Sequence, residues 1–198
     1  MSLRIEQDGR VRRITLAAPA RRNTIDAALA TALLHEFSQA DADPATSAIL
    51  LDAEGPVFCG GAESLAELPE GLFTFGSQAR KPVIAAVQGI AISAGLALIA
   101  NAHVVLAAQG SSFGLTEIRE GRAHIGLLQA VARAIGMRRT TELALTGRVF
   151  STPEALSWGL VHAVAPAFEL DDRATATATA LANSGWVAVQ AVLACGRS

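Results

Sequence analysis

One long apolar stretch constrains this chain more than any other feature. Residues 86–107 read AVQGIAISAGLALIANAHVVLA and contain one histidine but no other ionisable side chain. About twenty consecutive apolar residues suffice to span a bilayer. However, Gln88-Gly89 interrupts the stretch early, Asn101 and His103 lie near its end, and no Lys or Arg flanks its C-terminal side. We therefore exclude a membrane anchor and expect a buried core.

The composition of this stretch changes along its length, which indicates several elements rather than one helix. PVIAAVQG (82–89) is rich in β-branched residues and ends on glycine, as a buried strand does. ISAGLALIAN (92–101) is rich in Ala and Leu and ends on Asn, which is typical of a buried helix. HVVLAA (103–108) is again β-branched. The stretch is therefore predicted to fold as strand, tight turn, helix and strand.

The rest of the chain predicts an α/β fold with several short strands. Asp8-Gly9 is a hairpin turn signal, and Ser151 or Thr152 lies where it can cap a helix that starts at Pro153. The other predicted strands are 3–7, 11–17, 46–52 and 160–164. The other predicted helices are 25–40 (with Asn23, Thr24 and Asp26 as capping groups), 125–145, and two short C-terminal helices broken at 183–185, while 63–80 is expected to be irregular.

Composition and charge exclude several classes of function. The 198 residues suggest one domain, and the 51% hydrophobic and 17% charged content excludes general disorder. The net charge of −2, without a run of like charges, argues against nucleic-acid binding. Cys59 and Cys195 show no metal-ligand spacing and fit reduced thiols. Because the N-terminus lacks the apolar stretch of a secretory signal, we expect a soluble, cytoplasmic protein without a metal site.

Two glycine-containing turns are the strongest candidates for a functional site. FCGGAES (58–64) and GIAISAGLA (89–97) each follow a predicted buried strand. Backbone N–H groups at such positions lack intrahelical partners, so one from each turn would bind a single oxygen if the strands are neighbours. The alternative is that the small residues only permit close packing of helices on strands.

Several longer motifs resemble the crotonase (enoyl-CoA hydratase/isomerase) superfamily. They occur in the family's order and read PARRNTID, GPVFCGGAES, RKPVIAAVQGIAISAGLALIANAHVVLA, FGLTEIREG and LALTGRVFSTPEALSWGLVHAV. The resemblance covers roughly residues 1–165. It implies an α/β spiral of ββα units over 1–165, a shortened helical tail over 166–198, and a homotrimer or hexamer. It also implies an acyl-CoA substrate, with coenzyme A as part of the substrate and no separate cofactor.

The resemblance also assigns site residues. The two oxyanion donors become the N–H groups of Ala62 and of Ala94, the latter in Ser93-Ala94-Gly95 where the family usually has three glycines. The loop along the coenzyme A comprises Arg21, Arg22, Asn23 and Thr24. An arginine there suits phosphate groups, although exposed arginines are common.

The acid and base positions depart from the family pattern. Hydration of an enoyl thioester needs two carboxylates, and the first family position is Ala97, whereas the second is retained as Glu117. One glutamate can still move a proton between the α and γ carbons, so the sequence favours double-bond isomerisation over hydration. Other candidates for proton transfer are Glu63, Glu120 and His124, and for each of the two glutamates a non-catalytic role is the simpler alternative.

Two other functions remain open at this stage. The GIAISAG turn also resembles the nucleophile turn of Clp-type serine peptidases, so that Ser93 would be a nucleophile in a peptidase or thioester hydrolase with His124 as its base. The resemblance further implies that 64–81 is short and that the chain ends one helix or more early. A catalytically silent protein that binds CoA esters or mediates assembly is therefore the other alternative.

Overall fold

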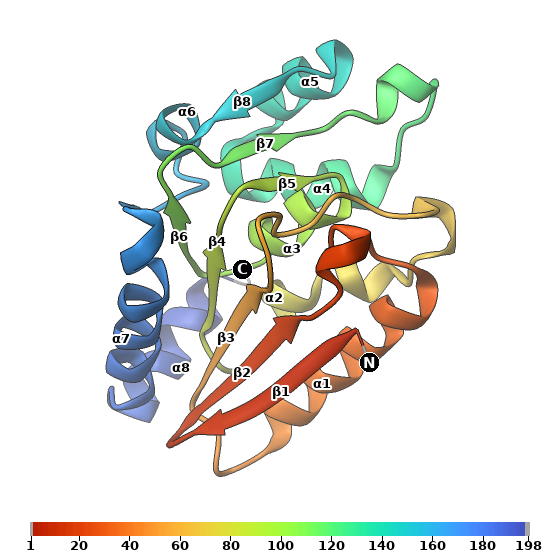
Figure 1. The fold of residues 1–198 in the computed structure, drawn as a ribbon. Helices are drawn as coiled ribbons and strands as arrows, with labels where there is room; N and C mark the ends of the chain where they lie inside the picture. Colours follow the sequence, from red (N-terminus) through yellow and green to blue (C-terminus); the bar gives the residue numbers. More distant parts are fainter. Residues whose placement is uncertain (1, 197–198) are drawn as a thin grey trace.

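The computed structural model describes residues 2–196 of the chain. Within these residues, six strands form the main sheet in the order β1-β2-β3-β4-β6-β9 (Figure 1). They are β1 (Leu3–Asp8), β2 (Val11–Leu16), β3 (Ala48–Ala53), β4 (Val83–Val87), β6 (Val104–Ala108) and β9 (Ala163–Ala165). β1 and β2 form the predicted antiparallel hairpin, and all other neighbours are parallel.

A second, smaller sheet continues from the carboxyl end of β4. It consists of β5 (Ile90–Ile92), β7 (Ser112–Gly114) and β8 (Val149–Ser151), with β5 parallel to β7 and β7 antiparallel to β8. The chain enters this sheet at Gly89, which has a φ of 65°. A Cβ at this position would lie 1.9 Å from the Pro56 carbonyl oxygen, so only glycine fits. Alternation between the two sheets is the ββα spiral that the resemblance implies.

Helices cover both faces of the main sheet. They are α1 (Ala27–Ala42), α2 (Phe75–Gln78), α3 (Ala94–Ala100), α4 (Ile125–Ile135), α5 (Met137–Thr146), α6 (Thr152–Ser157), α7 (Leu170–Ala182) and α8 (Trp186–Cys195). Single turns of 3-10 helix are η1 (Pro19–Arg21), η2 (Leu65–Glu67), η3 (Glu70–Phe73), η4 (Glu117–Glu120) and η5 (Ala167–Glu169).

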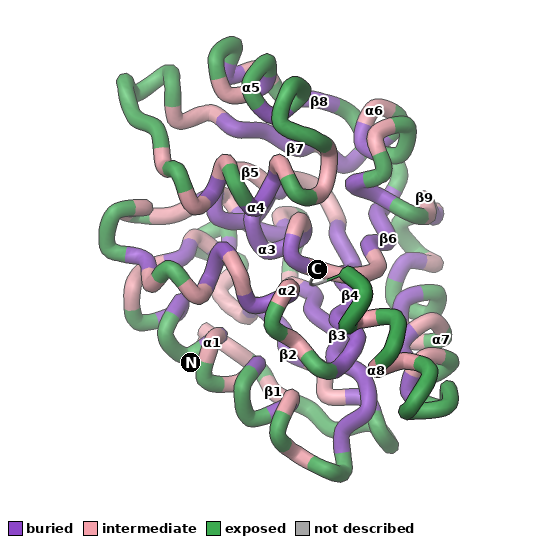
Figure 2. Tube along the Cα trace, turned by 180° about the vertical axis from the view of Figure 1, so that it is seen from behind, coloured by how far each residue is buried: buried purple, intermediate pink, exposed green. Residues whose placement is uncertain are grey.

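Two apolar clusters form the core. The larger one contains buried residues of both sheets, of α1 and of α3, and Figure 2 shows the buried α3 in the middle of the molecule. The smaller one lies on the other face of the main sheet, where α7 buries Leu170, Ala174, Ala178 and Ala182 against β2, β3, β4 and β6. Part of the predicted C-terminal tail therefore belongs to the core.

The predicted helix caps are confirmed in two places. The Asp26 side chain accepts a hydrogen bond from Leu29 N at 2.7 Å and caps α1. Ser151 and Glu154 form a capping box at the start of α6. Such caps satisfy backbone N–H groups that have no partner within the helix, which is why the local sequence predicts them.

Three predictions of secondary structure need correction. The single helix expected over 125–145 is two helices, because Gly136 adopts φ 83° between α4 and α5. β5, β7 and β8 were not predicted, since three-residue strands give too short a pattern to detect. The last strand occupies Ala163–Ala165 rather than 160–164. The region 63–80 contains η2, η3 and α2.

The long apolar stretch 86–107 is no membrane helix, since it forms the end of β4, then β5, α3 and most of β6. In the described residues no single helix has the length and apolar character needed to cross a bilayer. The segments 167–182 and 186–195 meet that criterion only when counted together, and they are bent by 105°.

Candidate active site

Three strand ends meet at the carboxyl edge of the small sheet. Cys59 forms a parallel bridge with Ala91, with Cys59 N donating to Ile90 O at 3.0 Å and Ile92 N donating to Cys59 O at 3.2 Å. On the other side of β5, Ser93 N donates to Gly114 O at 3.0 Å. The segments that follow, 60–62, 93–94 and 115–117, therefore start side by side. The predicted proximity of the two glycine turns is confirmed.

Gly95 holds the two turns in direct contact. A Cβ on Gly95 would lie 2.6 Å from Cys59 Cβ and 3.0 Å from the Cys59 carbonyl oxygen. Only glycine permits this approach, because real side-chain contacts are longer. Burial raises the pKa of the Cys59 thiol to about 12, although N–H groups of Gly61 and Gly95 oppose that effect. Cys59 is therefore a neutral packing residue between the turns.

The N–H groups of Ala62 and Ala94 are available at this contact. Ile25 N donates to Gly61 O and Glu63 N donates to Ile25 O, each at 2.9 Å. The residues on both sides of Ala62 are therefore hydrogen-bonded to Ile25, whereas the N–H of Ala62 is not. Neither Ala62 nor Ala94 donates a backbone hydrogen bond to another residue within 2–196. Two uncommitted donors on adjoining turns are the elements of an oxyanion hole.

Glu117 begins η4 three residues after Gly114. Three residues of extended chain reach at most about 10 Å, so the Glu117 backbone lies within that distance of Gly114, the residue that pairs with the start of the Ala94 turn. Glu117 Oε1 is buried and has no hydrogen-bond partner among the described residues. Buried polar atoms without partners are rare in folded proteins, and the residue Glu117 also lines a pocket of about 170 Å³. The other lining residues are Ile118, Arg122, Ala123, His124, Leu127, Leu128, Thr141, Ala144 and Leu145.

The position of the missing carboxylate offers no replacement. Ala97 is fully buried in α3, and its carbonyl accepts a hydrogen bond from Asn101 Nδ2 at 2.9 Å.

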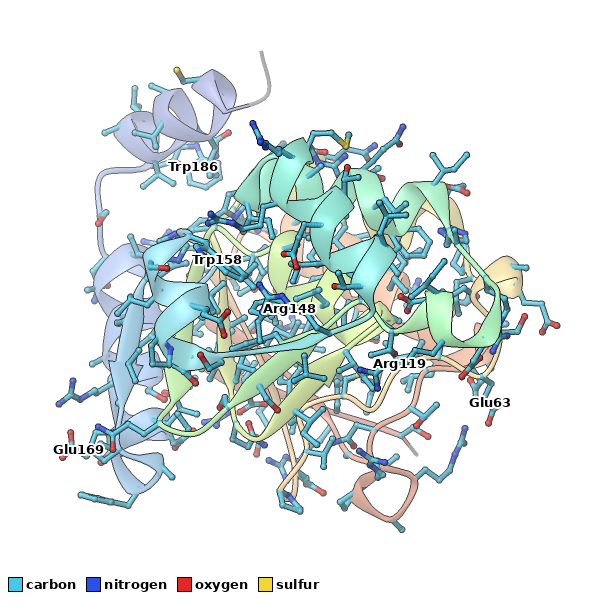
Figure 3. The ribbon with its side chains drawn as sticks, turned by 90° about the horizontal axis from the view of Figure 1, so that it is seen from above. Glu63, Arg119, Arg148, Trp158, Glu169 and Trp186 are labelled. Atoms are coloured by element: carbon cyan, nitrogen blue, oxygen red, sulfur yellow. The ribbon has the colours of Figure 1, made fainter. Side chains whose placement is uncertain are left out.

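The predicted substitutes for the missing carboxylate differ in their availability for chemistry. Glu63 lies at the edge of the molecule with 60% of its side chain exposed and pairs with Arg21 at 2.7 Å (Figure 3). Glu120 is exposed and pairs with Arg122.

His124 is the one substitute that shares the pocket of Glu117. Its Nδ1 accepts a hydrogen bond from Leu127 N at 3.2 Å and so caps α4. Its ring packs on Phe73 with a centroid distance of 4.6 Å. Because Nδ1 is used as an acceptor, Nε2 is the ring nitrogen that remains for chemistry.

Two polar side chains of the predicted coenzyme A loop make hydrogen bonds to the protein backbone. Asn23 is fully buried, and its side chain accepts from Ala18 N and donates to the carbonyls of Glu54 and Val57 at 2.8–3.0 Å. Its amide is therefore committed to the loop itself. The Thr24 hydroxyl likewise donates to Arg21 O at 2.8 Å.

The two arginines of this loop differ. The side chain of Arg21 pairs with Asp26 at 3.0 Å and with Glu63, and these carboxylates raise its pKa. Arg22 is exposed, with a left-handed backbone at φ 54°. Arg22 is thus the arginine of the loop for which the described residues show no ion pair.

Sequence reasoning missed the α5 part of the pocket and the strain at one turn. Thr141, Ala144 and Leu145 reach the pocket from α5, and no local pattern signals a contact across more than twenty residues. Ser93 has φ 56° and ψ −123°. A serine at a position where the family usually has glycine was the sequence signal for this backbone strain. His103 and His162 accept hydrogen bonds from Val83 N and Val105 N, respectively, so each ring nitrogen satisfies a backbone N–H of the main sheet.

Comparison with solved structures assigns the fold. A putative enoyl-CoA hydratase/carnithine racemase from Magnetospirillum magneticum AMB-1 matches with a TM-score of 0.91 and 26% identity, over 100% of this chain and 82% of that one. An enoyl-CoA hydratase from Mycobacterium paratuberculosis matches with a TM-score of 0.86 and 29% identity, over 98% and 86%. The molecule therefore has the crotonase fold.

Sequence comparison gives the family. The model of the enoyl-CoA hydratase/isomerase family matches residues 6–195. A probable enoyl-CoA hydratase of Mycobacterium bovis is 34% identical over 192 residues, which are 90% of this chain and 74% of that protein. A mevalonyl-coenzyme A hydratase of Aspergillus fumigatus is 30% identical over 191 residues, which are 86% and 68%. This chain belongs to the enoyl-CoA hydratase/isomerase family.

Proposed function

We propose that this chain isomerises enoyl-CoA thioesters with one carboxylate, Glu117, and the N–H groups of Ala62 and Ala94. The observation that carries the proposal is the buried Oε1 of Glu117, which has no partner within residues 2–196 and follows a strand paired with the turn of Ala94. Family membership supports the acyl-CoA substrate. Alanine at position 97 supports isomerisation over hydration, because hydration uses a second carboxylate to activate water.

The proposed reaction moves one proton and consumes no water. The Glu117 carboxylate removes a proton from Cα of a 3-enoyl thioester, and the electron pair of the broken C–H bond shifts onto the carbonyl oxygen. The N–H groups of Ala62 and Ala94 stabilise that negative charge. Protonated Glu117 then returns the proton to Cγ, the carbonyl re-forms, and the double bond lies between Cα and Cβ. The carboxylate ends in its starting state.

The test is turnover of trans-3-enoyl-CoA and trans-2-enoyl-CoA, assayed in parallel with wild type and Glu117→Gln. Loss of general acid–base catalysis typically costs about 10²- to 10⁴-fold, so isomerisation should fall by that factor in the variant. Glu67→Gln is the matched control, because it makes the same change at an exposed side chain in η2. Equal isomerisation by wild type and Glu117→Gln, with both folded, would refute the proposal.

Hydration gives a second, independent reading of the same assay. Rapid addition of water to trans-2-enoyl-CoA would show that another group replaces the missing carboxylate. His124→Ala would then be tested first, because His124 shares the pocket of Glu117. Glu63 and Glu120 would follow.

A catalytically silent CoA-ester-binding protein is the second candidate. It is favoured by Ala97, because the loss of one family carboxylate is also what an inactive member would show. This candidate predicts binding of butyryl-CoA in calorimetry without turnover of either enoyl-CoA. The isomerase predicts both binding and turnover.

We also propose a homotrimer or hexamer in the cytoplasm. Apolar side chains exposed on α8 support self-association, since Val187 is 81% exposed and Val192 72%. Figure 3 shows α8 at the edge of the molecule, starting at the labelled Trp186, and Gln190 Nε2 of α8 donates a hydrogen bond to Arg80 O. Sedimentation equilibrium of the full chain measures the mass directly, and a monomer at micromolar concentration would contradict this proposal.

A further inference from the structure

Ser93 has a backbone conformation that serine rarely adopts. Its φ is 56° and its ψ is −123°, at the point where the chain leaves β5 and enters α3. Within residues 2–196, the other non-glycine residues with positive φ are Arg22 and Asn23. Glycine adopts such angles without penalty, whereas a Cβ makes them costly.

The conformation is imposed by the surrounding hydrogen bonds. Ser93 N donates to Gly114 O at 3.0 Å, and Ser93 O accepts from Ala97 N at 3.1 Å. These bonds attach the turn to β7 on one side and to α3 on the other. Glycine would satisfy them equally well with less strain, so the fold alone does not account for a side chain at this position.

The side chain of Ser93 faces the other glycine turn. A Cβ built on Gly61 would lie 3.4 Å from Ser93 Cβ and 3.8 Å from Ser93 Oγ. Gly61 directly precedes Ala62, and Ser93 directly precedes Ala94. The side chain of Ser93 therefore lies against the turn that carries the Ala62 N–H, and Ser93 itself directly precedes the Ala94 N–H.

The Ser93 hydroxyl is not used by the rest of residues 2–196. Ser93 is only 8% exposed, and its Oγ makes no hydrogen bond with any residue in the described part of the chain. A hydroxyl without a protein partner is available to a ligand. Backbone strain and an unpartnered hydroxyl on a largely buried residue thus coincide beside two free donors, which is the arrangement expected of a group kept for a ligand.

We propose that Ser93 Oγ–H is a third hydrogen-bond donor to the thioester carbonyl oxygen. The inference rests on the proposed function and adds a side-chain donor to its two backbone donors. A donor fixed in place stabilises the oxygen most when negative charge develops on it, because no reorganisation is needed at that moment. Ser93 thereby discriminates thioesters and their enolates from CoA derivatives that lack a carbonyl oxygen.

A nucleophilic Ser93 is the competing assignment, and the contacts favour the donor. A serine nucleophile needs a base within hydrogen-bond reach. Neither His124 nor Glu117 makes a hydrogen bond with the hydroxyl, and His124 Nδ1 is used to cap α4. A donor needs no such base.

The first experiment compares Ser93→Ala with Ser93→Gly. The alanine variant keeps Cβ and the strain but lacks the hydroxyl, whereas the glycine variant removes both. Loss of one oxyanion donor typically costs about 10²-fold or more in turnover, so both variants should lose isomerisation by a similar factor. Only Ser93→Gly should unfold at a higher temperature than wild type. Ser38→Ala, at an exposed position of α1, is the control.

The second experiment tests the donor without requiring turnover. Calorimetry compares butyryl-CoA with its S-butyl thioether, which has a methylene in place of the carbonyl. Loss of one hydrogen bond is worth about 2- to 10-fold in affinity, so Ser93→Ala should weaken butyryl-CoA by that factor and leave the thioether unchanged. This result holds even if wild type isomerises nothing, so failure of the proposed function and failure of this inference are distinguishable.

Two results would overturn the inference. Full turnover and an unchanged thioester preference in Ser93→Gly would mean that the hydroxyl is incidental to the site. A mass increase equal to an acyl group on wild type, absent from Ser93→Ala, would instead make Ser93 a nucleophile.

Discussion

Substitution of Gly95 by alanine tests the contact on which the candidate site depends. The new Cβ would lie 2.6 Å from Cys59 Cβ and 3.0 Å from the Cys59 carbonyl oxygen, whereas carbon atoms pack at about 3.5–4.0 Å. The two turns must therefore separate by about 1 Å. Neither atom of Cys59 belongs to a flexible side-chain end, so the backbone has to move.

The expected loss of stability follows from this overlap. Overpacking of a buried site typically costs about 1–3 kcal/mol, and alanine returns at most about 1 kcal/mol of helix propensity in α3. The melting temperature of a chain of this size changes by about 2–4 °C per kcal/mol. We therefore expect Gly95→Ala to melt up to about 12 °C below wild type.

Activity should fall more than stability. The turns carry the N–H groups of Ala62 and Ala94, and misplacement of a catalytic group by about 1 Å can cost about 10²-fold in rate. The assay is thermal unfolding by circular dichroism together with turnover of trans-3-enoyl-CoA at a temperature where the variant is folded. Gly185→Ala is the control, because a Cβ at Gly185 meets nothing within 4 Å and its φ is −61°. If Gly95→Ala matches wild type in both measurements, the contact does not hold the turns and the reasoning is wrong.

Two further predictions concern single groups. The Leu29 N–H and Arg21 lower the pKa of Asp26. The stability that the ionised Asp26 contributes is therefore complete above the ordinary aspartate pKa and is lost as the pH falls through the folded-state pKa. Asp26→Ala should lower the free energy of unfolding by about 1 kcal/mol at pH 7 and by much less near pH 2, as measured by urea unfolding. Burial raises the pKa of Cys59 to about 12, whereas Cys195 is exposed on α8. Titration with a thiol reagent at pH 8 should therefore find one reactive thiol in the native protein and two in denaturant. Two rapidly reacting thiols in the native protein would contradict the burial of Cys59.

Local sequence determines much of this protein by itself. The hairpin at Asp8-Gly9 and the cap at Asp26 depend on residues close together in the chain, where turn and capping preferences act directly. The interruption of the apolar stretch at Gln88-Gly89 was sufficient to reject a membrane helix. The assignment of Ala97 and Glu117 to the two carboxylate positions came from the family resemblance of motifs that are continuous in sequence, and it stays a prediction.

Local sequence was least informative where short elements or single glycines decide the outcome. β5 has three residues, fewer than a periodic pattern needs. The break between α4 and α5 depends on one glycine in a region whose residues otherwise favour helix throughout. Asn23 was assigned to the coenzyme A loop, and only the structure shows that its side-chain amide donates hydrogen bonds to backbone carbonyls more than thirty residues away.

Only the tertiary structure decided which groups share the site. Cys59 pairs with Ala91, and Ser93 with Gly114, across 32 and 21 residues of chain, and these pairings bring the separate turns and Glu117 to one edge of the small sheet. The strain at Ser93 also arises there, because a residue between β5 and α3 must satisfy hydrogen bonds to both sides. Short-range preferences specify each turn, whereas the relative positions of the turns depend on long-range strand pairing and on the close approach that Gly95 permits.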